Sequence, residues 1–194
     1  MKILLKRNDV NHDKPGDGDQ TAVWWAAHNG HEGVVKMLLR QDEINSNKPD
    51  NDDWAQLWKD AHNGHKGVVK ILLRRENCNP SKRDNDSGTL FLRATYNGCQ
   101  GVVKILLERD DINPDRSDNH GSAPLFWAAL NKYKGLVKIL LKRNNVNYDK
   151  PDNDDGTPLW RATHNGHEGV VNMLLRQDKI NSNKPDNDDR TQLW

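Results

Sequence analysis

The sequence predicts an all-α solenoid, in which short pairs of helices stack one repeat on the next, and three observations predict it. A pair of apolar residues recurs every 34 residues: Val34-Val35, Val68-Val69, Val102-Val103, Leu136-Val137 and Val170-Val171. Apolar residues make up only 34% of the 194 residues and gather in compact blocks such as "VVKILL". The stretches between the blocks are rich in Asn, Asp, Pro and Ser, which favour turns. Repetition at this period is the signature of a repeat architecture.

The first helix of each repeat is predicted to end at a turn that usually contains Asn-Gly. In the second repeat, Leu57 and Ala61 lie four residues apart and therefore share one helical face. Asn63-Gly64 ends this helix, because glycine accepts the left-handed conformation needed just beyond a helix end.

The second helix of that repeat is predicted to start near Lys66 and to carry the apolar block. Apolar residues at nearly every position predict burial on more than one side. The leucine that closes the block recurs in all five repeats, and we expect it to be buried: Leu39, Leu73, Leu107, Leu141 and Leu175. Helices this short are marginal alone in water, so stacking must stabilise them.

The 34-residue register divides the chain into repeats. We predict a partial repeat over 1–20, full repeats over 21–54, 55–88, 89–122, 123–156 and 157–190, and the start of a further repeat over 191–194. The chain begins inside a second helix and stops inside a first helix, without the polar caps that solenoids need. We therefore expect a fragment of a longer array or of a larger protein.

The segment "TPLWRATHNGHEGVVNMLL" at 157–175 resembles the ankyrin repeat, whose pattern is T-P-L-H-x-A-A-x-x-G-H-x-x-V-V-x-L-L-L. The resemblance covers nearly the whole chain, recurs five times, and is similar in style to arrays of large fungal proteins. It implies antiparallel helix pairs whose connecting loops project as β-hairpin-like fingers. It also implies a non-enzymatic module that binds other proteins.

Departures from the family pattern are local. The finger's turn glycine is kept at Gly121, whereas Asp and Ser, of which Asp tolerates a positive φ, hold the equivalent places: Asp53, Ser87, Asp155 and Asp189. Asp60 stands where other repeats have Ala, and Lys132 replaces the Gly of the helix-to-helix turn. We expect these two substitutions to weaken their repeats.

Three H-x-x-H pairs are candidate metal ligands, because imidazole binds zinc: His28/His31, His62/His65 and His164/His167. No carboxylate or cysteine recurs in register with them, and other residues take the equivalent places in other repeats: Tyr96, Cys99, Leu130 and Tyr133. We interpret the second histidine of each pair as making a structural hydrogen bond to a neighbouring loop backbone. The acidic loop at 149–156 does not have the calcium-loop spacing.

Motifs for catalysis are missing: neither a phosphate loop nor G-x-S-x-G occurs. We therefore expect no enzymatic activity, no catalytic residues, no metal, no cofactor and no small-molecule substrate. A net charge of +1 gives no bulk attraction to nucleic acid or membrane. No apolar run approaches the ~20 residues of a membrane helix, and two cysteines offer no disulfide framework. We expect an intracellular, cytoplasmic protein, with a nuclear location left open.

One position of the first helix changes chemistry between repeats that otherwise copy one another, and we call it the helix-face series: Trp25, Lys59, Arg93, Trp127 and Arg161. Trp and Arg are the residues most enriched at binding hot spots. In a stack, neighbouring members would lie ~10 Å apart. With Trp54 at a finger tip, the resemblance places this series on the concave binding side. We predict that these six residues bind a protein partner; the alternative is that the tryptophans pack on fingers and the cations are solvated.

Two further series accompany it. Large apolar residues precede the helix-face series and are expected to seal the joint between repeats: Trp24, Trp58, Leu92, Phe126 and Trp160. A basic row lies on the second helices: Lys36, Lys70, Lys104 and Lys138. Cations near helix C-termini are favoured by the helix dipole, so this row has a structural explanation. The alternative function is that the row binds an anionic partner, either nucleic acid or membrane lipid.

Overall fold

The structure, a computed structural model, describes residues 21–39, 64–74 and 79–181. Within those ranges it contains nine α-helices and no β-strand, which is the all-α repeat solenoid expected from the sequence. None of the described helices is long and apolar enough to cross a membrane. The predicted site residues Trp54 and Lys59, and the substitution at Asp60, lie outside the described residues.

The chain divides into two compact units, residues 1–79 and residues 80–194, called here the N-terminal and C-terminal units. The helices of the N-terminal unit are α1 (Ala22–His28), α2 (Glu32–Leu39) and α4 (Lys66–Leu72). Those of the C-terminal unit are α5 (Leu90–Tyr96), α6 (Gln100–Leu106), α7 (Pro124–Leu130), α8 (Lys134–Leu140), α9 (Pro158–His164) and α10 (Glu168–Leu175).

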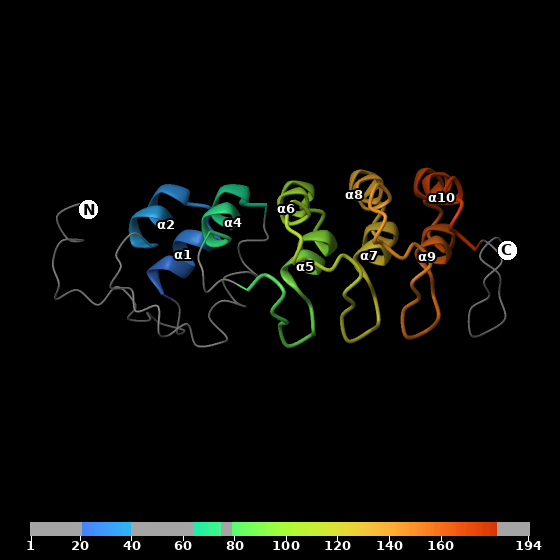
Figure 1. Cartoon of the computed structure of the whole chain (residues 1–194), viewed down its shortest axis with the longest axis horizontal. Coiled ribbons are helices and arrows are strands. Elements are labelled where there is room, and N and C mark those ends of the chain that lie inside the picture. Colours follow the sequence, from blue (N-terminus) through green and yellow to red (C-terminus); the bar gives the residue numbers. More distant parts are fainter. Residues whose placement is uncertain (1–20, 40–63, 75–78, 182–194) are drawn as a thin grey trace. The chain divides into compact units, whose positions relative to one another are not determined.

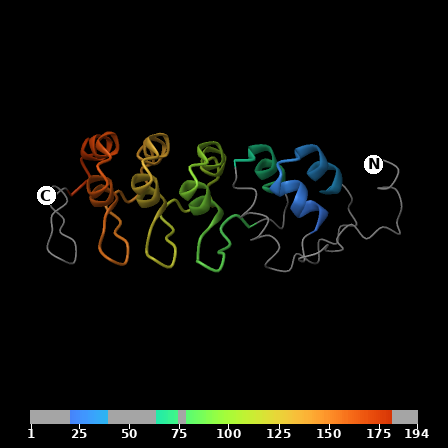
Figure 2. The same cartoon turned by 180° about the vertical axis from the view of Figure 1, so that it is seen from behind.

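Within the C-terminal unit, the helices form two parallel rows (Figures 1 and 2). The first helices α5, α7 and α9 pack on one another, and the second helices α6, α8 and α10 do the same. The loops that lead into α5, α7 and α9 all project to the same side of the helices (Figure 1). We call these three loops the fingers.

Each first helix has a defined start and end. Thr89 caps α5 by accepting a hydrogen bond from the backbone N–H of Leu92 at 3.3 Å, and Thr157 does the same for Trp160 at 3.1 Å. Helix α5 ends at Tyr96, and the side chain of the next residue, Asn97, donates to the carbonyl of Arg93 at 2.9 Å. The residue after this Asn has a positive φ, as the sequence predicted for the Asn-Gly turns: Gly30, Gly64, Gly98 and Gly166.

The second helices bury a stripe rather than the whole apolar block. In α6, Val102, Val103 and Leu106 are fully buried. The next leucine, Leu107, is only half-buried, and Leu73 is in the same position after α4. The prediction that the closing leucine is buried is therefore confirmed for Leu39 but wrong for Leu73 and Leu107, and also for Leu141, which is half-buried, and for Leu175, which is 42% exposed. In the repeats where it is wrong, the fully buried leucine precedes the closing leucine by one residue, because one residue turns the side chain by about 100° around the helix.

Two members of the series that was expected to seal the joints are buried in the C-terminal unit, whereas Trp24 and Trp160 are half-buried and Trp58 lies outside the described residues. Leu92 and Phe126 are almost completely buried between repeats of the C-terminal unit. The guanidinium of Arg161, from the following repeat, lies 5.2 Å from the centroid of the Phe126 ring. This arrangement confirms the packing role of Leu92 and Phe126.

Candidate binding surface

The structure describes four of the six predicted site residues. Trp25 lies on α1 in the N-terminal unit and is 51% exposed. Arg93 on α5, Trp127 on α7 and Arg161 on α9 lie in the C-terminal unit and are half-buried. The last three occupy equivalent positions in successive first helices, so the geometry around each can be compared directly.

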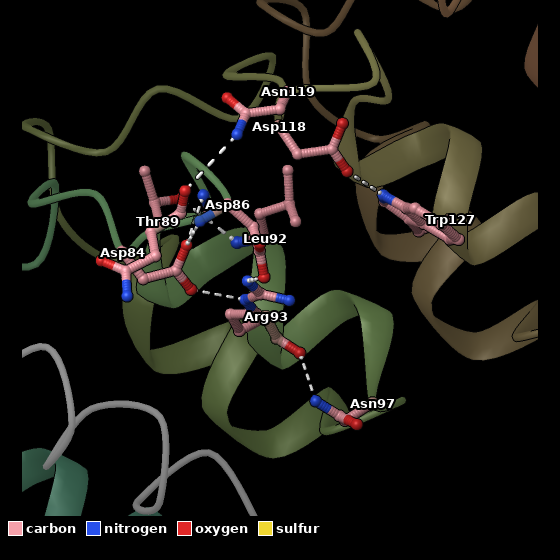
Figure 3. A network of polar contacts seen from close by, with 11 residues as sticks. Asp84, Asp86, Thr89, Leu92, Arg93, Asn97, Asp118, Asn119 and Trp127 are labelled. Carbon is pink, nitrogen blue, oxygen red and sulfur yellow. Dashed lines mark hydrogen bonds and ion pairs between the residues drawn. The ribbon is translucent and has the colours of Figure 1, made fainter.

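Arg93 is held by the finger that leads into its own helix (Figure 3). Its Nε donates to Oδ2 of Asp84 at 2.6 Å, and its Nη2 donates to Oδ2 of Asp86 at 2.6 Å. The other oxygen of Asp84 accepts hydrogen bonds from the backbone N–H groups of Gly88 at 2.8 Å and Asp86 at 3.0 Å. One carboxylate therefore closes the finger and ties it to the helix.

Trp127 repeats this arrangement with a neutral donor. Its indole Nε1 donates to Oδ2 of Asp118 at 2.9 Å (Figure 3). Oδ1 of Asp118 accepts from the backbone N–H groups of His120 at 2.9 Å and Ser122 at 3.0 Å. The indole ring is thereby fixed against its own finger.

Arg161 completes the set. Its Nη2 donates to Oδ2 of Asp152 at 2.7 Å, and Oδ2 of Asp154 lies 3.9 Å from the same nitrogen. The guanidinium also lies over the Trp160 ring, 4.9 Å from its centroid. On each of the helices α5, α7 and α9, the helix-face residue donates a hydrogen bond to an aspartate nine residues earlier in the chain.

This pairing has electrostatic consequences at Asp84. Burial works to raise the pKa of its carboxyl, but the hydrogen bonds from Arg93 and from the backbone of Gly88 and Asp86 outweigh burial and lower it. The pKa of Arg93 is raised, chiefly by its bond to Asp84. Both groups are therefore held in their charged forms.

Fingers of the C-terminal unit are also joined to each other. The backbone N–H of Asn119 donates to the carbonyl of Asp86 at 3.2 Å, and that of Asn153 donates to the carbonyl of His120 at 2.9 Å. Ser87, Gly121 and Asp155 have φ values of 60°, 75° and 59°, so the three equivalent finger positions all have the positive φ of the family's turn glycine.

Tyr96 is a surface residue that sequence reasoning missed. It stands at the end of α5 and is 43% exposed. Its ring meets the ring of Trp127 edge to face, with centroids 4.8 Å apart. The sequence carries a signal for it, since Tyr stands here at the helix end where three other repeats have His.

The N-terminal unit also exposes aromatic rings. Trp25 meets Trp24 edge to face, with ring centroids 4.9 Å apart, and lies 6.1 Å from the ring of His28. Trp24 and His28 are stacked, with centroids 5.0 Å apart. Of the described members of the helix-face series, Trp25 is exposed, whereas the other three are half-buried.

Two of the three second histidines, His65 and His167, make a structural hydrogen bond to another repeat, but the acceptor is at a helix end rather than in a loop. The ring of His65 lies 3.1 Å from the backbone carbonyl of His28, and the ring of His167 lies 3.1 Å from that of Ala129. Both bonds join one repeat to the end of the first helix of the preceding repeat. In the described part of the chain, no three His, Cys, Asp or Glu residues come together as a metal site. Burial raises the pKa of the Cys99 thiol, which opposes formation of a nucleophilic thiolate.

The basic row of the second helices is exposed on α2, α4, α6 and α8: Lys36, Lys70, Lys104 and Lys138. It stands apart from the fingers, because the second helices form the row opposite the finger side in the C-terminal unit (Figure 1). Lys104 and Lys138 are thus separated from the aspartates of the fingers within that unit.

Paired helices that repeat along the chain, with fingers tied to the first helix, define a repeat protein of the ankyrin type. A family model described as ankyrin repeats (3 copies) matches residues 1–84, 57–152 and 91–188. The chain belongs to the ankyrin-repeat family. A comparison with curated proteins gives no match. Ankyrin repeats generally mediate protein–protein interaction.

Proposed function

We propose that this chain is a non-enzymatic interaction array, built of five full 34-residue repeats of the fungal type, that binds a protein partner. The partner contacts first helices and finger tips. The residues proposed to contact it are those of the predicted site: Trp25, Trp54, Lys59, Arg93, Trp127 and Arg161. The proposed compartment is the cytoplasm, because two cysteines in the whole chain give no disulfide framework.

The observation that carries this proposal is the exposure of aromatic side chains beside fixed charges. Trp25 and Tyr96 are among the exposed large hydrophobic residues, and Arg93 and Trp127 are immobilised by their fingers. Aromatic and guanidinium groups dominate binding energy at interfaces. Side chains already held in place lose less entropy when a partner arrives.

The test is capture of binding peptides from a random display library by the whole chain. The joint variant Trp25→Ala, Arg93→Ala, Trp127→Ala should lose binding of the selected peptides by more than roughly tenfold. Helical content, followed by circular dichroism, should remain. Peptides that bind this folded variant as tightly as the wild type would contradict the proposal.

The chain supplies a matched control in the same three repeats. Lys36→Ala, Lys104→Ala and Lys138→Ala replace exposed residues of α2, α6 and α8 and should leave the binding of the selected peptides unchanged.

A second candidate function is binding of an anionic partner by this basic row, and the exposure of all four lysines favours it. Binding driven by phosphate groups falls steeply as salt rises, whereas an aromatic contact between proteins changes little. Loss of an RNA or anionic-vesicle ligand in the three-lysine variant, together with a steep salt dependence, would establish the second function instead.

A further inference from the structure

We infer that the C-terminal unit binds a basic, extended segment of its partner, through a surface that we call the finger-tip face. This surface consists of the tips of the three fingers and the exposed side of α5, α7 and α9. The inference rests on the proposed function and adds the chemistry of the partner. It is carried by the charge, the exposure and the spacing of the residues on this face.

The charge of the finger-tip face is negative. Its two cations, Arg93 and Arg161, are outnumbered by the aspartates of the finger tips: Asp84, Asp86, Asp118, Asp152, Asp154 and Asp155. The arms of the fingers carry four cations and two carboxylates, namely Lys82, Arg83, Arg116 and Lys150 against Asp115 and Asp149. The net charge of the tips, the helix arginines and the arms together remains negative, and the negative charge is concentrated at the tips.

Each arginine pairs with one inner and one outer carboxylate, and only the outer carboxylate is the more exposed member. The inner carboxylates of Asp84 and Asp152 are 18% and 5% exposed. The side chain of Asp86 is 74% exposed, whereas that of its partner Arg93 is 23% exposed. The side chain of Asp154 is 87% exposed, against 25% for Arg161. A partner that approaches this face therefore meets carboxylates in front of guanidinium groups that already have acceptors.

Both arginines already donate hydrogen bonds to finger carboxylates. Arg93 uses Nε and Nη2 on Asp84 and Asp86, and Arg161 uses Nη2 on Asp152. To pair with these guanidinium groups, an acidic peptide would have to displace the finger carboxylates, and its own carboxylates would then be repelled by them. Like charges placed together oppose binding, so this face disfavours an acidic peptide, while the arginines also hold the aspartates in place.

Aromatic rings lie between the two exposed carboxylates. Tyr96 and Trp127 meet edge to face at 4.8 Å. Trp127 is on α7, which packs between α5 and α9, the helices that follow the fingers of Asp86 and Asp154. Aromatic faces attract Lys and Arg side chains by cation–π interaction. The aromatic pair and the carboxylates therefore favour the same kind of side chain.

The spacing of the repeats sets the spacing of the partner's cations. Asp86 and Asp154 are 68 residues apart, which is two repeats. With helix-packing distances of about 10 Å, two repeats correspond to roughly 20 Å. An extended chain advances roughly 3.4 Å per residue, so two cations about six residues apart match these two carboxylates.

The probe is a synthetic, fluorescein-labelled peptide, Gly-Arg-Gly-Ser-Gly-Ser-Gly-Arg-Gly, in which the two arginines are six residues apart. Its binding to the whole chain is measured by fluorescence anisotropy at low salt. We expect it to bind at least roughly tenfold more tightly than the same peptide with Glu in place of Arg. Equal binding of the Glu peptide, or no binding of the Arg peptide at about 1 mM protein, would overturn the inference.

A matched pair of variants locates the binding. The double variant Asp86→Asn, Asp154→Asn should weaken binding of the Arg peptide by roughly tenfold, and Tyr96→Ala by roughly threefold to fivefold. The control is Asp110→Asn, Asp178→Asn, which removes two exposed carboxylates with the same two-repeat spacing outside the finger-tip face. The control should change affinity less than about twofold. Equal losses in both double variants would overturn the assignment to the finger tips.

The library experiment separates this inference from the proposed function. Selected peptides that are acidic or apolar, but still require Trp25, Arg93 and Trp127, would refute the basic partner and leave the interaction array intact. Selected peptides that bind the triple variant normally would refute the array itself. Basic peptides that require Tyr96 and the two aspartates would support both.

Discussion

Single residues in this chain are constrained most where the backbone enters the left-handed region. Four described turns between the helices of a pair have glycine there, with φ between 65° and 95°. Lys132 occupies the same place with a φ of 60°. A side chain in this conformation costs roughly 1–2 kcal/mol, so the substitution noted in the sequence is a local strain in the fourth repeat.

We predict that Lys132→Gly stabilises the C-terminal unit. Relief of the left-handed conformation is offset partly by the greater freedom of glycine in the unfolded chain, which leaves a gain of roughly 0.5–1 kcal/mol. The midpoint of thermal or urea unfolding measures it.

The control Lys138→Gly replaces a lysine inside α8 and should instead cost about 1 kcal/mol. The reverse change, Gly98→Ala, should also destabilise, because a Cβ there would lie 3.0 Å from Cζ of Tyr133 at a φ of +73°. A destabilised Lys132→Gly variant would show that the lysine side chain makes a contact that matters more than the strain.

The binding surface could be predicted from the sequence only in part, and the limits are visible at single residues. The helix-face series was recognisable because Arg93 and Trp127 differ in chemistry where neighbouring positions agree. The contacts of Arg93 with Asp84 and Asp86 could not be predicted from the sequence. The number of residues between two positions does not determine the path of the loop that joins them. Nor does a sequence show how far Tyr96 stands out from its neighbours.

At the scale of the helix, whether an apolar side chain is buried depends on its angular position around the helix axis rather than on its residue type. In α4, the side chains of Val68, Val69 and Leu72 have no exposed surface, while Leu73, at the end of the helix, is half-buried. The apolar block alone did not reveal this difference, because leucine or isoleucine stands at positions 71 to 73 in turn. The existence of the helix was predictable from the 34-residue period; its exact orientation was not.

We predict that Leu72→Ala destabilises the chain by about 2–5 kcal/mol, because it leaves a cavity among buried side chains. Leu73→Ala, one residue further, should cost only about 1 kcal/mol, since roughly half of that side chain is already in contact with water. Paired urea titrations of the two variants measure the difference. Equal losses would show that α4 is rotated from the orientation described.

For the molecule as a whole, the aspartates of the fingers and joints make stability depend on pH. Asp84 has a pKa lowered below its usual 3.8 in the folded chain, with burial opposing and hydrogen bonds prevailing. Its contribution is therefore present above the unfolded pKa and is lost as the pH falls through the folded pKa. Asp115 acts in the opposite sense: burial raises its pKa, despite the backbone N–H of Asn147 and the charge of Lys150.

We predict opposite changes in acid sensitivity for two variants. Asp84→Asn should be less stable than the wild type at pH 6 and should lose less further stability on acidification to about pH 3. Asp115→Asn lacks a carboxyl group that favours the folded state when protonated, so its stability should fall more steeply over the same range. Melting midpoints between pH 6 and pH 3 test both, with Asp110→Asn as the exposed control; parallel curves for all variants would contradict the assignment.

The hydrogen bonds between neighbouring fingers bear on how such a chain can change over time. They run from the N–H groups of Asn119 and Asn153 to the carbonyls of Asp86 and His120, and so use backbone atoms that every non-proline residue possesses. A duplicated repeat would carry this joint with it whatever side chains its finger tip displays. The hydrogen bonds between fingers are thus the same whichever side chains the finger tips carry. A new binding specificity can therefore arise by duplication of a repeat and substitution of its finger-tip residues, with the contacts between repeats unchanged.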